Sequence, residues 1–93
     1  MFDRILKQMR DRIRSRQYVM TIHAEEEMDD DDLTVFDVES VVLTGTIVER
    51  QKDVKAGERK YVIRGKALGG GRAAVVARLG QTGKLVFITV YRE

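Results

Sequence analysis

The chain has 93 residues with neither cysteine nor proline, and 43% of its residues are hydrophobic. This length allows one small domain, and the apolar content is too high for a disordered chain. The lack of cysteine excludes a disulfide scaffold and a thiolate metal site. No apolar run approaches the roughly 18 residues that span a bilayer, and the N-terminus lacks the apolar core of a signal peptide, so we expect a cytoplasmic protein.

The net charge of +2 combines three blocks of opposite sign. Residues 1–20 hold six Lys or Arg and two Asp, and residues 21–45 hold nine Asp or Glu without Lys or Arg. Residues 46–93 hold eleven Lys or Arg and four Asp or Glu. The acidic block either attracts the basic parts of the same fold or serves a partner, and the sequence leaves both readings open.

Apolar residues recur at helical spacing over residues 2–16, which predicts an amphipathic helix laid on a sheet. We interpret its arginines as solvated helix surface, with contact to nucleic-acid phosphate as the alternative. A short extended run follows at residues 18–22.

Two shorter helices are predicted next. The first begins at His23 and is ended by four aspartates at residues 29–32, which compete for the backbone. The second covers residues 35–43, with Thr34 as its N-cap and Asp37 placed for a capping box.

Four alternating, strand-like runs fill the second half, beginning after Gly45, which lies where a C-terminal cap glycine belongs. They are residues 46–51, 59–66, 72–79 and 85–92. A polar loop at 52–58 and glycine turns at 69–71 and 80–83 connect them as a meander. Helices followed by consecutive strands predict an α+β fold, with the three helices packed on a four-stranded antiparallel sheet.

Two conspicuous stretches are not ligand sites. Residues 80–84 are too short for a phosphate loop, and no helix follows them. The aspartates at 29–32 lack the spacing and the glycine of a calcium loop. No Ser/His/Asp or metal-ligand constellation is visible, so we predict neither a metal nor a cofactor.

Basic residues are concentrated on the strands. If the registers match, alternation gathers six cations on one face of the sheet: Lys60, Arg64, Lys66, Arg72, Arg78 and Arg92. Such a face binds phosphates, and its alternative is the ordinary polar side of a one-sided sheet. Alternation also places Tyr61 on the opposite face of its strand, and Tyr91 on the side of Phe87.

A nuclease that uses the 2′-OH of RNA as nucleophile requires a base, an acid and cations, but no metal. Three side chains are candidates for proton transfer: His23, Tyr61 and Tyr91. The lone histidine is also explained as a first-turn residue that bonds to the backbone.

Five motifs occur in a set order: Thr21-Ile22-His23-Ala24-x-x-x-Met28, Leu33-Thr34-x-x-Asp37-Val38-Glu39, Gly45-x-Ile47-Val48-Glu49, Lys60-Tyr61-x-x-Arg64-Gly65 and Ile88-Thr89-Val90-Tyr91. In this order they resemble the domain of unknown function family four-two-five-eight over residues 18–92. Residues 1–17 then form an N-terminal helical addition to a single domain of residues 1–93.

The resemblance implies a fold related to the bacterial RelE/ParE toxin superfamily, with kinship to MqsR-type mRNA interferases. Toxins of that group cleave mRNA without a metal, commonly on the ribosome. A zinc-finger antitoxin of the YgiT/MqsA type is the implied partner. In MqsR-like proteins a Tyr on the second main strand and a Lys near the end of the last strand belong to the active site, and Tyr61 and Arg92 occupy the similar positions. Many family members carry Arg where this chain has Glu27.

The expected function is therefore that of a metal-independent endoribonuclease toxin. Its expected catalytic residues are His23, Tyr61, Arg64 and Arg92, and its expected RNA-binding residues are Lys60, Lys66, Arg72 and Arg78. One alternative is a non-catalytic module that binds RNA or an acidic antitoxin segment on the same face. Another is a homodimeric interaction domain paired through the helix at residues 2–16.

Overall fold

The computed structural model describes residues 1–53 and 57–93, with three helices and five strands among them. The elements are α1 (Asp3–Arg14), β1 (Tyr18–Met20), α2 (Ile22–Asp30), α3 (Val35–Thr44), β2 (Thr46–Asp53), β3 (Glu58–Lys66), β4 (Arg72–Leu79) and β5 (Leu85–Arg92). The mixed α+β class is thus confirmed. The loop predicted at 52–58 is shorter at both ends, and its residues 54–56 lie outside the described residues. None of the described helices is long and apolar enough to cross a membrane.

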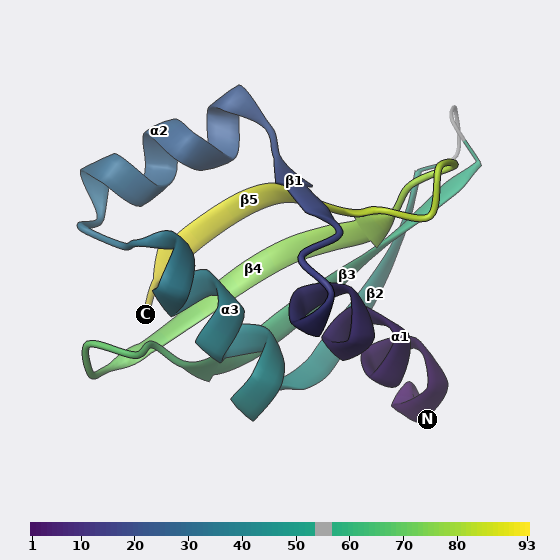
Figure 1. Ribbon diagram of the computed structural model, residues 1–93, viewed down its shortest axis with the longest axis horizontal. Helices are drawn as coiled ribbons and strands as arrows, with labels where there is room; N and C mark the ends of the chain where they lie inside the picture. The colour runs from purple at the N-terminus through teal and green to yellow at the C-terminus, as the bar shows by residue number, and fades with distance from the viewer. Residues whose placement is uncertain (54–56) are drawn as a thin grey trace.

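The sheet has five strands in the order β1-β5-β4-β3-β2, so the prediction of four strands was incomplete (Figure 1). The missing strand is the short extended run, whose residues Tyr18–Met20 pair in parallel with β5. Three residues are too few for alternation to identify a strand. The hydroxyl of Tyr18 donates to Glu39 on α3 at 2.5 Å, and burial together with this carboxylate raises the pKa of Tyr18 to about 12.

The helices lie on one side of the sheet, with α1 and α3 in front of it in Figure 1 and α2 beside β5. Met9 and Ile13 of α1 are buried in the core, and the guanidinium of Arg10 donates to the carbonyls of Val42 and Gly45 at 3.0 and 2.9 Å. These bonds satisfy carbonyls at the C-terminus of α3. The central part of the predicted apolar stripe is therefore used within the chain's own core.

A β-bulge interrupts β5. Val76 pairs with Thr89 but Ala77 pairs with Phe87, so Ile88 is an extra residue on β5. Beyond a bulge the side chains change faces relative to strict alternation. The predicted faces of Tyr91 and Arg92 were therefore wrong: each lies on the side expected for the other.

Gly45 also differs from its predicted conformation. Its φ of −94° and ψ of −173° are extended, not left-handed as a C-terminal cap glycine usually is. A Cβ at this position would lie 2.2 Å from the carbonyl oxygen of Arg64 and 2.4 Å from that of Val41. The absence of a side chain thus allows the end of α3 to touch β3.

The capping box of α3 is present as predicted. One oxygen of Asp37 accepts from the backbone N–H of Thr34 at 2.8 Å and from its hydroxyl at 3.0 Å. The other oxygen accepts from the N–H of Gly69 at 2.9 Å, and this bond connects the β3–β4 turn to α3. The bond from Thr34, followed by that from Gly69, lowers the pKa of the buried Asp37 carboxyl.

Stability should therefore depend on pH through Asp37. Because its folded pKa lies below the unfolded value of 3.8, the unfolded chain binds more protons between the two values. The contribution of Asp37 is full above the unfolded pKa and is lost as pH falls through the folded pKa. Asp37→Asn should cost about 1–3 kcal/mol at pH 7 and less at pH 3, measured by urea unfolding. A cost independent of pH would contradict this, and the exposed Asp29→Asn is the control.

Candidate functional site

The side of the sheet opposite the helices is here named the open face. Tyr61, Ile63, Ala73, Val75 and Ala77 belong to the core, so the residues that alternate with them in β3 and β4 point the other way. Strand register extends this set across β2 and β5. The open face comprises Thr46, Glu49, Gln51, Glu58, Lys60, Val62, Arg64, Lys66, Arg72, Ala74, Val76, Arg78, Val86, Thr89 and Tyr91.

Five of the six cations predicted to share a face lie on the open face. They are Lys60, Arg64, Lys66, Arg72 and Arg78. Lys66 is directly opposite Arg72 across the β3–β4 ladder, where like charges repel unless an anion lies between them. The arrangement concentrates positive charge on a surface that no helix of the described chain covers (Figure 1).

A hollow of about 400 Å³, here named the central hollow, lies in the middle of the open face. Its lining residues are Val48, Glu49, Gln51, Val62, Arg64, Val76 and Tyr91. Arg64 and Tyr91 lie in one row, separated by Ala74 of the strand between them. Two strand spacings put their Cα atoms about 10 Å apart, and the small Ala74 leaves the space between the two long side chains open.

Two exposed contacts involve the polar side chains that line the central hollow. The Nε of Arg64 lies 3.1 Å from a carboxylate oxygen of Glu93, and the side chain of Arg64 is 48% exposed. The side-chain amide of Gln51 donates to Glu49 at 2.6 Å. An ion pair this exposed contributes only about 0–1 kcal/mol, so an anionic ligand can displace Glu93 from Arg64.

A second hollow of about 370 Å³, here named the distal hollow, is lined by Glu58, Arg78, Gly80, Gln81, Thr82 and Val86. It lies at the β4–β5 turn. The Nε of Arg78 is 3.4 Å from a carboxylate oxygen of Glu58, which also lines this hollow. Since Arg78 pairs with Val86 and both lie on the open face, the two hollows open on the same side of the sheet.

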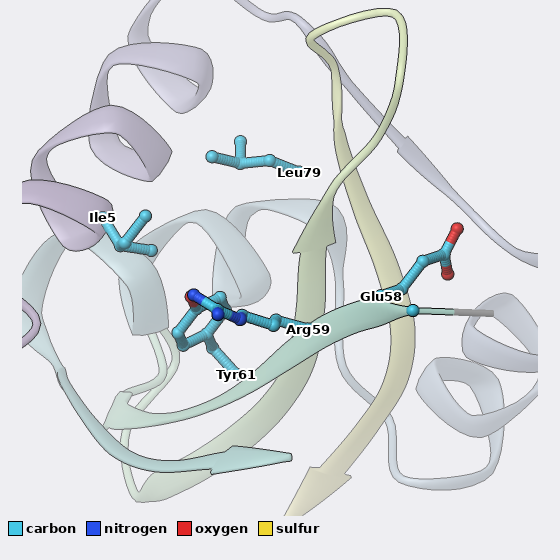
Figure 2. Close-up of a pocket in the computed structure, with 6 residues that line it drawn as sticks. Ile5, Glu58, Arg59, Tyr61 and Leu79 are labelled. Carbon is cyan, nitrogen blue, oxygen red and sulfur yellow. The ribbon is translucent and has the colours of Figure 1, made fainter. Parts of the chain in front are cut away.

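Tyr61 is on the other side of the sheet from Arg64. It is 6% exposed, and its ring packs edge-on against Phe2, with centroids 5.9 Å apart. Figure 2 shows Arg59 and Tyr61 on the side of α1, opposite Ile5, while Glu58 points away from them. These four residues, with Gly57 and Leu79, line a separate cleft of about 420 Å³. The structure therefore does not bring Tyr61 together with the cations.

His23 is an exposed residue of α2, with Nε2 3.3 Å from a carboxylate oxygen of Glu27. The same Glu27 oxygen accepts from the N–H of Val90 at 3.1 Å, and Asp31 accepts from the N–H of Arg92 at 2.8 Å. These two carboxylates bind the edge of β5 where β1 has ended. Part of the acidic block therefore stabilises the fold. Glu27 accepts a hydrogen bond from the backbone of β5, which an Arg side chain, a donor only, could not do.

Arg92 also binds the C-terminus of α2. Its guanidinium donates to the carbonyls of Asp31 and Asp32 at 3.2 Å each, and to that of Gly70 at 3.5 Å. Cations at this position satisfy the free carbonyls of a helix C-terminus. Of the four residues predicted as catalytic, only Arg64 lies on the open face.

Sequence reasoning missed Glu49 as a site residue and placed Tyr91 on the opposite face. Both line the central hollow with Arg64. The only sequence signal for Glu49 was its alternation with Gln51 in a strand next to the cationic one. The described residues contain no group of three or more His, Cys, Asp or Glu that could hold a metal ion.

Comparison with known families gives one match. The family model described as "Domain of unknown function (DUF4258)" matches residues 20–92. The matched region contains every residue of the open face, whereas α1 lies outside it. No curated protein and no solved structure matches the chain.

Proposed function

The chain belongs to the DUF4258 family, and from this premise we propose that it is a metal-independent endoribonuclease that binds RNA on its open face. Cleavage takes place in the central hollow. One observation carries the proposal: a carboxylate, a guanidinium and a phenol, those of Glu49, Arg64 and Tyr91, line one hollow on a cationic surface.

Binding follows from the chemistry of the open face. Its five cations suit the phosphates of a single strand, which is bound largely by charge. Val62 and Val76 form an apolar floor in the central hollow, and the partly exposed ring of Tyr91 at its wall offers a surface on which a base stacks. The strand displaces Glu93 when its phosphate binds Arg64.

The cleavage step needs only groups in the hollow and the RNA itself. Glu49 accepts the proton of the 2′-OH, and the 2′-oxygen attacks the adjacent phosphorus. Arg64 stabilises the charge that develops on the phosphate oxygens. The bond from phosphorus to the 5′-oxygen breaks as Tyr91 donates its proton to that oxygen. The products are a 2′,3′-cyclic phosphate and a 5′-hydroxyl, and exchange with water returns the proton from Glu49 to Tyr91.

The proposal includes the biological setting implied by the family resemblance. The protein acts in the cytoplasm as the toxin of a bacterial toxin–antitoxin pair, related in fold to the RelE/ParE toxins and the MqsR-type interferases. A zinc-finger antitoxin of the YgiT/MqsA type neutralises it, and mRNA, free or on the ribosome, is its substrate. Support comes from the motif order and from helices packed on one side of a cationic sheet.

Two tyrosines provide the test. Purified protein with a labelled RNA and EDTA should give cleavage with a 2′,3′-cyclic phosphate end. Tyr91→Phe and Glu49→Gln should each reduce the rate roughly 10²- to 10⁴-fold. Tyr61→Phe is the matched control and should cleave as the wild type does, because Tyr61 is buried on the other side of the sheet. Loss of cleavage in Tyr61→Phe, with cleavage retained in Tyr91→Phe, would overturn the assignment.

A second candidate is a non-catalytic module that binds RNA on the same open face. The observation that favours it is that His23, Tyr61 and Arg92 all lie away from that face, on the side of the helices. This candidate predicts salt-sensitive RNA binding without turnover. Intact RNA after prolonged incubation, together with tight binding, would select it over the endoribonuclease.

A further inference from the structure

We propose that the distal hollow is a second nucleotide subsite, which receives a base of the same RNA strand and sets the sequence preference of the protein. This inference rests on the proposed binding of RNA to the open face. It assigns to the β4–β5 turn a recognition role separate from the chemistry in the central hollow.

The separation of the two hollows suits one RNA strand. Ala74 lies in the row of Arg64 and Tyr91, and Arg78 lies four residues further along β4. At about 3.3 Å per residue the rows are about 13 Å apart. This distance equals about four nucleotides at a stacked spacing of about 3.4 Å, and fewer when the strand is extended. Val62 and Val76 lie between the rows, and Lys60, one residue before Tyr61, is level with Arg78, so the path has an apolar surface and a cation at its distal end.

The turn that forms the distal hollow is held in place. The N–H of Gly80 donates to the carbonyl of Lys84 at 2.8 Å, and the N–H of Gly83 donates to that of Gly80 at 3.0 Å. Arg12, from α1, donates through Nε to the carbonyl of Gly83 at 2.6 Å. Gly80 packs closely against the strand, since a Cβ there would lie 3.3 Å from Val86. A fixed turn offers its side chains to a ligand at little cost in conformational entropy.

The lining of the distal hollow suits a base. Val86 provides an apolar wall, and Arg78 provides a guanidinium for phosphate or for stacking. The side chains of Gln81 and Thr82 form no hydrogen bond with any described residue. Their amide and hydroxyl groups donate and accept, as recognition of a base edge requires.

The experiment compares wild-type protein with the double variant Gln81→Ala/Thr82→Ala on a pool of RNAs randomised around the cut. The wild type should prefer one base at a fixed position near the cut, by roughly tenfold. The double variant should lose this preference and cleave RNAs with any of the four bases at that position at equal rates. Gln8→Ala, an exposed change on α1, should keep the preference. A preference unchanged in the double variant would overturn the inference.

A binding measurement separates this inference from the proposed function. Fluorescence anisotropy with 2′-O-methyl RNA reports binding without cleavage. The double variant should bind an octanucleotide more weakly than the wild type, but a dinucleotide, too short to reach the distal hollow, equally well. Wild-type protein that neither binds nor cleaves RNA would end both proposals. If the double variant bound both the octanucleotide and the dinucleotide as tightly as the wild type, only the proposal of a distal subsite would be overturned.

Discussion

Arg64→Gln should lower the rate of RNA cleavage roughly 10²- to 10³-fold, the usual loss when one group that stabilises transition-state charge is removed. Arg64 is the only guanidinium that lines the central hollow in the described part of the chain. Glutamine keeps much of the length of the side chain and its ability to donate, but it has no charge for the phosphate oxygens. Single-turnover cleavage of an end-labelled RNA measures the chemical step directly.

The control for Arg64→Gln is on the same strand. Arg59 is exposed, lies on the opposite face of β3 and lines the cleft of Figure 2. Arg59→Gln removes the same charge from the protein, so it tests whether net charge alone explains the loss. Its cleavage rate should stay within about twofold of the wild type. Equal losses in the two variants would mean that the open face is not the site.

The same pair distinguishes cleavage from binding. If Arg64 binds a phosphate, Arg64→Gln should reduce the slope of log binding constant against log salt by about 0.7 for single-stranded RNA. Arg59→Gln should leave the slope unchanged. The melting temperature of Arg64→Gln should change little, because the exposed pair with Glu93 contributes about 0–1 kcal/mol. A cleavage defect is then not explained by unfolding.

Local alternation was sufficient to predict which cations share the open face in β3 and β4. Strands β3 and β4 pair in regular register from Tyr61 to Lys66, so the period of two placed Arg64, Lys66 and Arg72 correctly. The capping box at Thr34 and Asp37 was equally predictable, since both partners lie within one helical turn.

Long-range features were not predictable in the same way. The extra residue Ile88 is determined by pairing with β4, and a bulge leaves no mark in an apolar strand whose two faces look alike. Because of this bulge, Tyr91, the proposed acid, lies on the open face, and Arg92, which binds the end of α2, lies on the side of the helices. The contact of Glu27 with the edge of β5 is also tertiary: it exists because β1 is only three residues long.

Gly65→Ala should destabilise the fold strongly. A Cβ on Gly65 would lie 2.4 Å from the carbonyl oxygen of Val41 and 2.9 Å from the Cα of Gly45. Both obstacles are backbone atoms, so no side-chain rotation relieves the clash, and α3 must move away from β3. Overpacking of a core costs about 1–3 kcal/mol and occasionally more, and we expect the upper end or beyond. Urea unfolding monitored by circular dichroism measures the loss.

Gly69→Ala is the matched control for this glycine. Its Cβ would meet only a side-chain oxygen of Asp37 at 3.7 Å, an ordinary contact, and its N–H would still donate to that oxygen. Its stability should stay within about 0.5 kcal/mol of the wild type. Gly65 is also the residue after Arg64, so Gly65→Ala should lose cleavage together with its fold, whereas Arg64→Gln should lose cleavage alone. If Gly65→Ala were as stable as Gly69→Ala, the close contact between α3 and β3 would not hold the cationic strand in place.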